Sequence, residues 1–214
     1  MKKTVFSLLA LLASLSASAA DWGVTAGAGV ASIANEECES TVAYNVGAKV
    51  NIDLNENLFL EGSALFQHQG FSYRWRESIL GLSFTSNKTY DFDLFYLNLP
   101  VNVGWNFKIS DNFSIAPKLG LTFGFGLSGD ESDYDCDPFA DREEISRVEV
   151  FGYTSGSALK NFNRLDVGFN MGANFNIAKH FQIGAQYTFG MSDVSDDFED
   201  SNDRIFTANF TYFF

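Results

Sequence analysis

Histidine, cysteine and proline are scarce in this chain of 214 residues, which contains 2, 2 and 3 of them. With only His68 and His180 available, there is little material for a catalytic group of histidine, serine and carboxylate. Basic residues are also few, 14 against 27 acidic ones, and the net charge of −13 argues against nucleic acid as a partner. Beyond the N-terminal region no long uninterrupted apolar run occurs, which excludes membrane-spanning helices.

The N-terminus has the pattern of a secretory signal peptide over residues 1–20. Lys2 and Lys3 precede an uncharged run from residue 4 to 15, and small residues follow up to Ala20. Cleavage after Ala19 or Ala20 would leave a domain over residues 21–214 with a charge of about −15, because 12 basic residues remain against 27 acidic ones. An N-terminal anchor or a lipoprotein signal is the weaker alternative, since no cysteine lies at the cleavage site.

Eight segments alternate apolar residues with small or polar ones, which is the period of a β-strand. In the sharpest, Leu94–Phe107, seven large apolar side chains share one face, and the last segment ends the chain on an aromatic residue. The eight expected strands are Trp22–Ile33, Val42–Leu54, Leu58–Gly70, Leu94–Phe107, Phe113–Leu127, Arg164–Ile177, Phe181–Ser192 and Ile205–Phe214.

These strands predict an all-β fold: an eight-stranded antiparallel transmembrane β-barrel with up-and-down meander order. Each strand exceeds the ~9–11 residues needed to cross a bilayer at a tilt, and closure leaves no unpaired edge in the membrane. A soluble secreted β-sandwich is the alternative. Such a sandwich would not need a regular apolar outer face on every strand.

The lengths of the connections predict the orientation in the bacterial outer membrane. Short turns near residues 53–57, 108–112 and 178–180 alternate with long connections near 34–41, 71–93, 128–163 and 193–203. Short turns are typical of the periplasmic side and long loops of the outside, so both termini are expected in the periplasm. We expect a monomer that contacts outer membrane lipid or lipopolysaccharide, with aromatic residues at the turn ends as an interfacial girdle.

The inner faces carry few charges. Twelve of the 18 glycines fall there, since an eight-stranded barrel is only just wide enough to be filled by side chains. If the second hairpin turns about Asn55, Lys49 lies directly opposite Glu61, with Lys118 at a similar depth. We interpret Lys49, Glu61 and Lys118 as a structural plug that neutralises buried charge. The alternative is a proton- or ion-sensitive gate.

Two stretches carry a likeness to a known family. The segment YLNLPVNVGW (96–105), after LFLEGSALFQHQGF (58–71), resembles the PorT-like outer-membrane β-barrel family. The architecture is also similar to the small barrels typified by OmpX and by the membrane domain of OmpA. The resemblance covers residues 21–214 and implies a fold and a location. It implies no site residues.

Acidic residues gather in the expected outer loops and would attract a basic protein or another cationic surface ligand. In the third loop five acids follow the spacing of a Ca²⁺ loop at positions 1, 3, 5, 9 and 12. Pro138 takes the sixth position, where that loop needs glycine, so a solvated acidic loop is the alternative to Ca²⁺ or Mg²⁺ binding. The candidate ligands are Asp133, Asp135, Asp137, Asp141 and Glu144. No other cofactor is expected.

Both cysteines, Cys38 and Cys136, fall in expected outer loops of an exported chain, where disulfides persist. A bond between them would join loops one and three over the barrel mouth. Closing ~100 residues would stabilise the fold by about 4.7 kcal/mol in the chain-entropy model. Two separate thiols are the alternative.

Three functions remain open. The first is a non-enzymatic barrel with a structural, adhesion, ligand-binding or secretion-associated role. The second is a narrow gated porin. The third, a lipid-modifying enzyme, would need partners for His68, which lies near Gln69 and Ser72 without an evident acid. The first is the function that the sequence favours.

Overall fold

The computed structural model describes residues 20–34, 38–76, 87–135, 143–150, 163–193 and 202–214. Nearly all of the expected signal peptide lies outside these ranges, so it stays a prediction. None of the described segments forms a helix that could cross a membrane. The strands are β1 (Ala20–Ile33), β2 (Cys38–Asp53), β3 (Leu58–Arg76), β4 (Asn87–Trp105), β5 (Phe107–Ser110), β6 (Phe113–Asp135), β7 (Glu143–Glu149), β8 (Leu165–Ile177), β9 (Phe181–Asp193) and β10 (Asn202–Phe213).

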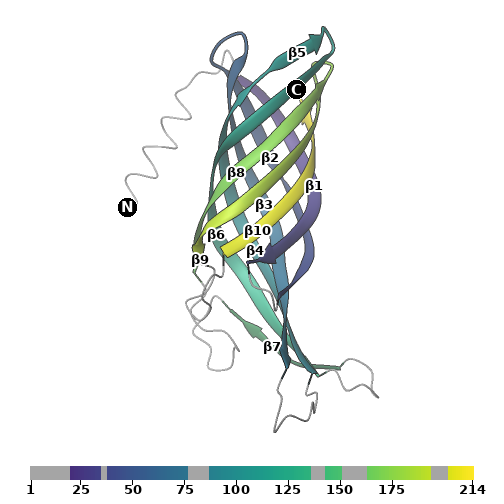
Figure 1. Cartoon of the computed structure of the whole chain (residues 1–214), viewed down its shortest axis with the longest axis vertical. Coiled ribbons are helices and arrows are strands. Elements are labelled where there is room, and N and C mark those ends of the chain that lie inside the picture. The colour runs from purple at the N-terminus through teal and green to yellow at the C-terminus, as the bar shows by residue number, and fades with distance from the viewer. Residues whose placement is uncertain (1–19, 35–37, 77–86, 136–142, 151–162, 194–201) are drawn as a thin grey trace.

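Eight of these strands close into an antiparallel barrel in meander order, which confirms the predicted fold. Each of β1, β2, β3, β4, β6, β8, β9 and β10 pairs with its neighbours along the chain. The first and last strands close the ring, with a ladder from Gly23 opposite Phe213 to Ile33 opposite Asp203. The short β5 follows β4 after Asn106 and pairs with β6, and β7 pairs with the far part of β6. Figure 1 shows β5 and the C-terminus at one end of the long axis and β7 at the other.

Side chains alternate across the barrel wall in the reverse sense of a soluble protein. On β2, Val42 is 66% exposed and Val46 is 57% exposed, while Asn45 between them is 4% exposed. The same holds on β10, where Phe210 is 51% exposed and the neighbouring Thr211 is 1% exposed. An apolar outer wall around a polar interior is stable where lipid replaces water, because the lipid solvates the outer side chains.

The strands at the β7 end are longer than the sequence pattern predicts. The regions 71–93 and 128–163 were expected to be loops, but β3 continues to Arg76, β4 starts at Asn87 and β6 reaches Asp135. Beyond the bilayer the outward positions need no apolar side chain, so the apolar residues that mark every second position of a membrane strand are missing there. The inward apolar residues remain, since Phe71 on β3 lies opposite Phe92 on β4.

Proline cannot donate to a strand ladder, so Pro100 and Pro117 predict local bulges. The ladder continues through both, with Pro100 opposite Thr122 and Pro117 opposite Ala173. The register of β4 against β6 shifts instead between Phe95 and Tyr96.

Candidate functional site

A buried carboxylate lies inside the barrel and accepts from side chains of four other strands. Glu61 on β3 is 1% exposed. Lys118 Nζ on β6 lies 2.5 Å from its Oε1, and Lys49 Nζ on β2 lies 3.3 Å from its Oε2. Asn102 Nδ2 on β4 donates to Oε1 at 3.0 Å, and Asn174 Nδ2 on β8 donates to Oε2 at 2.7 Å. Each carboxylate oxygen thus has one ammonium and one amide partner.

Hydrogen bonds continue from this carboxylate around the lumen. Lys49 Nζ donates to Gln182 Oε1 on β9 at 2.9 Å, and Gln182 Nε2 donates to Asn176 Oδ1 at 2.8 Å. Asn170 Nδ2 donates to Asn102 Oδ1 at 3.2 Å. We call the set that joins six of the eight barrel strands the lumen plug. Its members are Lys49, Glu61, Asn102, Lys118, Asn174 and Gln182.

The structure therefore brings together the three charges that the sequence singled out, although their expected register is wrong. Lys49 lies opposite Ser63, and Glu61 lies opposite Asn51, so the lysine and the carboxylate meet diagonally. Diagonal neighbours on one face of a sheet are within reach of a long side chain. Sequence reasoning missed the amide members of the lumen plug, because inward Asn and Gln residues give no signal that separates a hydrogen-bonded plug from a wet channel.

A glycine beside the lumen plug shows why small residues line this wall. A Cβ on Gly120 of β6 would lie 2.0 Å from the Val101 carbonyl oxygen and 2.6 Å from Oδ1 of Asn102, both too close for any real contact. The β4 backbone and the amide that donates to Glu61 therefore occupy the space that a side chain at position 120 would need. This agrees with the expectation that inner glycines make room for the few large polar side chains.

An apolar cluster, which we call the outer core, fills the interior towards the β7 end. Tyr96, Phe92 and Leu94 are at most 2% exposed, and Phe71 stacks on Phe92 with ring centroids 4.6 Å apart. The sequence analysis did not find this cluster, because it assigned residues 71–93 to a loop. The buried members are Ile33, Phe71, Tyr73, Phe92, Leu94, Tyr96 and Val150.

Acidic residues lie side by side on the strands beyond the barrel. Asp93 on β4 pairs in register with Asp130 on β6, which pairs with Glu149 on β7. The Asp93 side chain is 50% exposed and Glu149 is exposed, whereas Asp130 is partly buried. We call Asp93, Asp130 and Glu149 the acidic row. The register thus gathers negative charge on adjacent strands at this end of the barrel, with Asp93 also in contact with His68.

Three of the five predicted Ca²⁺ ligands fall on β6 and β7, two of the strands that carry this row. Asp133 and Asp135 belong to β6, and Glu144 belongs to β7 opposite Tyr134. Asp137 and Asp141 lie outside the described residues. Among the residues that the structure does describe, no three of the types His, Cys, Asp and Glu are grouped so that they could hold a metal ion. Metal binding by the full set of five acids stays a prediction.

The predicted disulfide also stays a prediction. Cys38 is the first residue of β2, where it pairs in register with Tyr73 and packs against the outer core. Cys136 follows β6 directly and lies outside the described residues.

The two histidines are held by separate contacts. His68 Nε2 lies 3.1 Å from Asp93 Oδ1, so the structure supplies the acid that the sequence left unidentified. Ser72 does not complete this pair, because its hydroxyl donates to Asp91 Oδ1 at 2.7 Å. His180 lies near the other rim, with Nδ1 2.9 Å from the carbonyl oxygen of Phe213.

The closed barrel with an apolar wall and a polar interior defines the class as a transmembrane β-barrel of the outer membrane type. The chain belongs to the family described as outer membrane protein beta-barrel domain, whose model matches residues 5–214. It is therefore a protein of the bacterial outer membrane, as the sequence predicts. No curated protein matches the chain.

The chain is similar to solved structures at low sequence identity. Ail, the attachment invasion locus protein of Yersinia pestis, in complex with the heparin analogue sucrose octasulfate, is 14% identical. That likeness covers 92% of this chain and 99% of Ail, with a TM-score of 0.43. Neisserial surface protein A is 12% identical over 90% of this chain and 97% of its own, with a TM-score of 0.46. The narrower likeness to the PorT-like family stays a prediction.

Proposed function

We propose that this protein is a sealed, non-enzymatic outer membrane barrel that binds a basic partner or a cationic surface ligand through the acidic row. The observation that carries the proposal is the register of Asp93, Asp130 and Glu149, which puts three carboxylates side by side on strands beyond the barrel. The proposal takes the orientation that the loop lengths predict, in which the β7 end lies outside the cell and both termini lie in the periplasm.

The lumen plug supports a binding role over a pore. Its side chains join six strands across the interior, and Glu61 is only 1% exposed. An eight-stranded barrel has room for side chains but not for a wide water path. Solute transport through the lumen would require this buried network to come apart.

The contacts of the histidines support a role without catalysis. A serine nucleophile needs a base within hydrogen-bond reach. The Ser72 hydroxyl donates to Asp91, while both ring nitrogens of His68 face other acceptors, Asp93 and the Val42 carbonyl. The contact between His68 and Asp93 therefore has a structural role, because it joins β3 to β4.

The binding proposal is tested with a fluorescent deca-lysine peptide and the purified barrel in lipid nanodiscs. We expect saturable binding that weakens as salt is added, because exposed charges are screened. Replacing the acidic row by Asp93→Asn, Asp130→Asn and Glu149→Gln should weaken binding by about tenfold, since each exposed ion pair contributes about 0.5 kcal/mol.

A matched control removes acids from the other end of the barrel. Asp111 and Glu56 are exposed in the short turns there, and Asp111→Asn with Glu56→Gln should leave peptide binding unchanged. Equal loss in both sets of variants would show that net charge, not the acidic row, attracts the peptide. A mass spectrum of lipid A that changes on expression of the protein would contradict the non-enzymatic part of the proposal.

A further inference from the structure

Two buried carboxylates lie inside the barrel between the lumen plug and the mouth. Asp203, near the start of β10, is 4% exposed, and Asp166, near the start of β8, is 8% exposed. β9 lies between their strands. The sequence analysis treated Asp203 as a loop acid. In the structure Asp203 instead belongs to the barrel wall, where it pairs in register with Ile33 of β1, and its side chain is buried in the interior.

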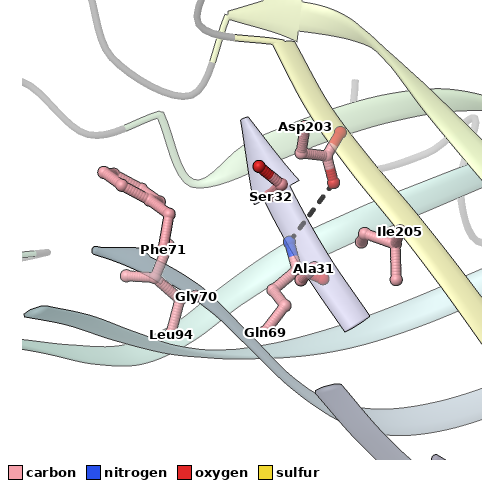
Figure 2. Close-up of a pocket in the computed structure, with 8 residues that line it drawn as sticks. All are labelled: Ala31, Ser32, Gln69, Gly70, Phe71, Leu94, Asp203 and Ile205. Carbon is pink, nitrogen blue, oxygen red and sulfur yellow. Dashed lines mark hydrogen bonds between the residues drawn. The ribbon is translucent and has the colours of Figure 1, made fainter. Parts of the chain in front are cut away.

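One oxygen of Asp203 has a weak partner and the other has none in the described part of the chain. Gln69 Nε2 donates to Oδ2 at 3.4 Å, as Figure 2 shows. Oδ1 is buried without a hydrogen-bond partner and packs directly over Gly190 of β9. The pocket on the Gln69 side is lined by Phe71, Leu94 and Ile205 and by Ser32, whose hydroxyl donates to the Ile33 carbonyl at 3.2 Å (Figure 2).

Asp166 reaches the same part of β9 from the other side. Its Oδ1 accepts a hydrogen bond from Ser192 Oγ at 2.6 Å. Ser192 lies two residues from Gly190 on the same face, a separation of about 7 Å along a strand. The two carboxylates therefore meet the same inner face of β9, Asp203 over Gly190 and Asp166 at Ser192 two residues further on, and their like charges repel.

The described residues provide no base for either carboxylate. Lys49 and Lys118 pair with Glu61 in the lumen plug. Arg164 and Arg204 adjoin the two acids in sequence, but both side chains are exposed. Two buried negative charges without a counter-charge are strongly unfavourable, so a bound positive charge would stabilise them.

We propose that Asp166 and Asp203 bind one divalent cation of the calcium type, with water completing its ligand shell. Two carboxylates balance a charge of two. An orphaned carboxylate oxygen is a hard ligand of the kind that Ca²⁺ takes, and Ca²⁺ tolerates an irregular set of protein oxygens better than Mg²⁺ does. The ion would join β8 to β10 across β9 and fix the strand ends at the mouth.

Thermal unfolding of the detergent-folded, chelator-treated protein tests the site, with CaCl₂ added stepwise. At a hundredfold excess over the dissociation constant we expect the unfolding midpoint to rise by about 5–10 °C in the wild type. Asp203→Asn should abolish the rise. Asp111→Asn is the control, because it removes one exposed acid from a short turn at the other end of the barrel and should leave the rise intact.

Equilibrium dialysis with ⁴⁵Ca²⁺ on the folded fraction keeps the test valid if Asp203→Asn folds poorly. Asp166→Asn and Asp203→Asn should each bind one ion fewer than the wild type. The proposal is overturned if Ca²⁺ has no effect on the wild type, or if Asp203→Asn keeps the full effect. It is also overturned if acidification in chelator stabilises the wild type while Ca²⁺ does not, because protons alone would then neutralise the pair.

Discussion

The Glu61 carboxylate faces two ammonium groups, those of Lys49 and Lys118, in a layer where all three residues are at most 8% exposed. Losing the acid leaves two buried cations close to one another, whereas losing one lysine leaves a balanced pair. Breaking a buried ion pair from one side commonly costs about 3–5 kcal/mol, because the remaining charge has no partner. The two kinds of loss should therefore differ in their cost.

We expect Glu61→Gln to lower the free energy of unfolding by about 3–5 kcal/mol and Lys118→Met to lower it less. Urea-induced unfolding in lipid vesicles, followed by tryptophan fluorescence, measures both. The two variants remove one charge each from the same ion pair, so each serves as the control of the other. If Lys118→Met proved as costly as Glu61→Gln, packing rather than charge balance would explain the lumen plug.

The sequence predicted the charged members of the lumen plug but not their partners. Lys49, Glu61 and Lys118 stand out because charge on an inward face is rare. Asn102, Asn174 and Gln182 look like any other inward polar residue. Their roles depend on which side chains meet across the lumen, and strand register within one hairpin does not determine that.

Among the strands, the pairing of β2 with β3 has an irregularity in which the His68 side chain contacts the backbone. The register shifts between Ser40 and Tyr44, and His68 Nδ1 lies 3.2 Å from the Val42 carbonyl in this gap. His68 Nε2 lies 3.1 Å from Asp93 Oδ1 on β4. From β3, the His68 ring thus contacts both β2 and β4 near the mouth.

We expect His68→Ala to speed amide hydrogen exchange at residues 41–44 of β2 and to lower stability by about 1–2 kcal/mol, since two hydrogen bonds are lost. Exchange mass spectrometry checks the first effect. His180→Ala removes a histidine bonded near the other rim and should leave residues 41–44 unchanged. Unchanged exchange in His68→Ala would mean that the irregularity is stable without the ring. Nitrogen NMR of the ring would separately report whether both nitrogens carry protons.

The strands illustrate where the sequence pattern ends. Within the bilayer both faces of a strand carry a signal, and all eight barrel strands were found. Beyond it only inward residues such as Phe71 and Phe92 carry one. The sequence pattern therefore predicts a loop for the outer third of each of β3, β4 and β6. The shift between Phe95 and Tyr96 falls at Gly126 of β6, but glycines recur along the inner faces of the barrel strands, so this one does not single out an irregularity.

For the whole molecule, closure could be predicted because one physical requirement decides it. A strand edge cannot remain unpaired in lipid, and an even number of amphipathic strands leaves the first and last available to each other. The ladder of β1 and β10 meets this requirement, and the pair of Thr25 and Thr211 adds a hydrogen bond of 2.9 Å across the seam. The composition of the wall thus determines the ring, whereas the contents of the lumen depend on contacts between distant strands.

The sealed lumen leads to a prediction for the entire barrel. We expect the wild type to give no discrete current steps in planar bilayers, because the lumen plug joins six strands and Glu61 is 1% exposed. A general porin reconstituted in the same bilayer checks that insertion would be detected, and the change in gel mobility on heating checks that the barrel is folded. Disrupting the plug with Glu61→Gln should give brief, small openings, since two repelling lysines remain. Regular steps from the wild type, with or without reductant, would contradict the sealed barrel and favour the gated porin.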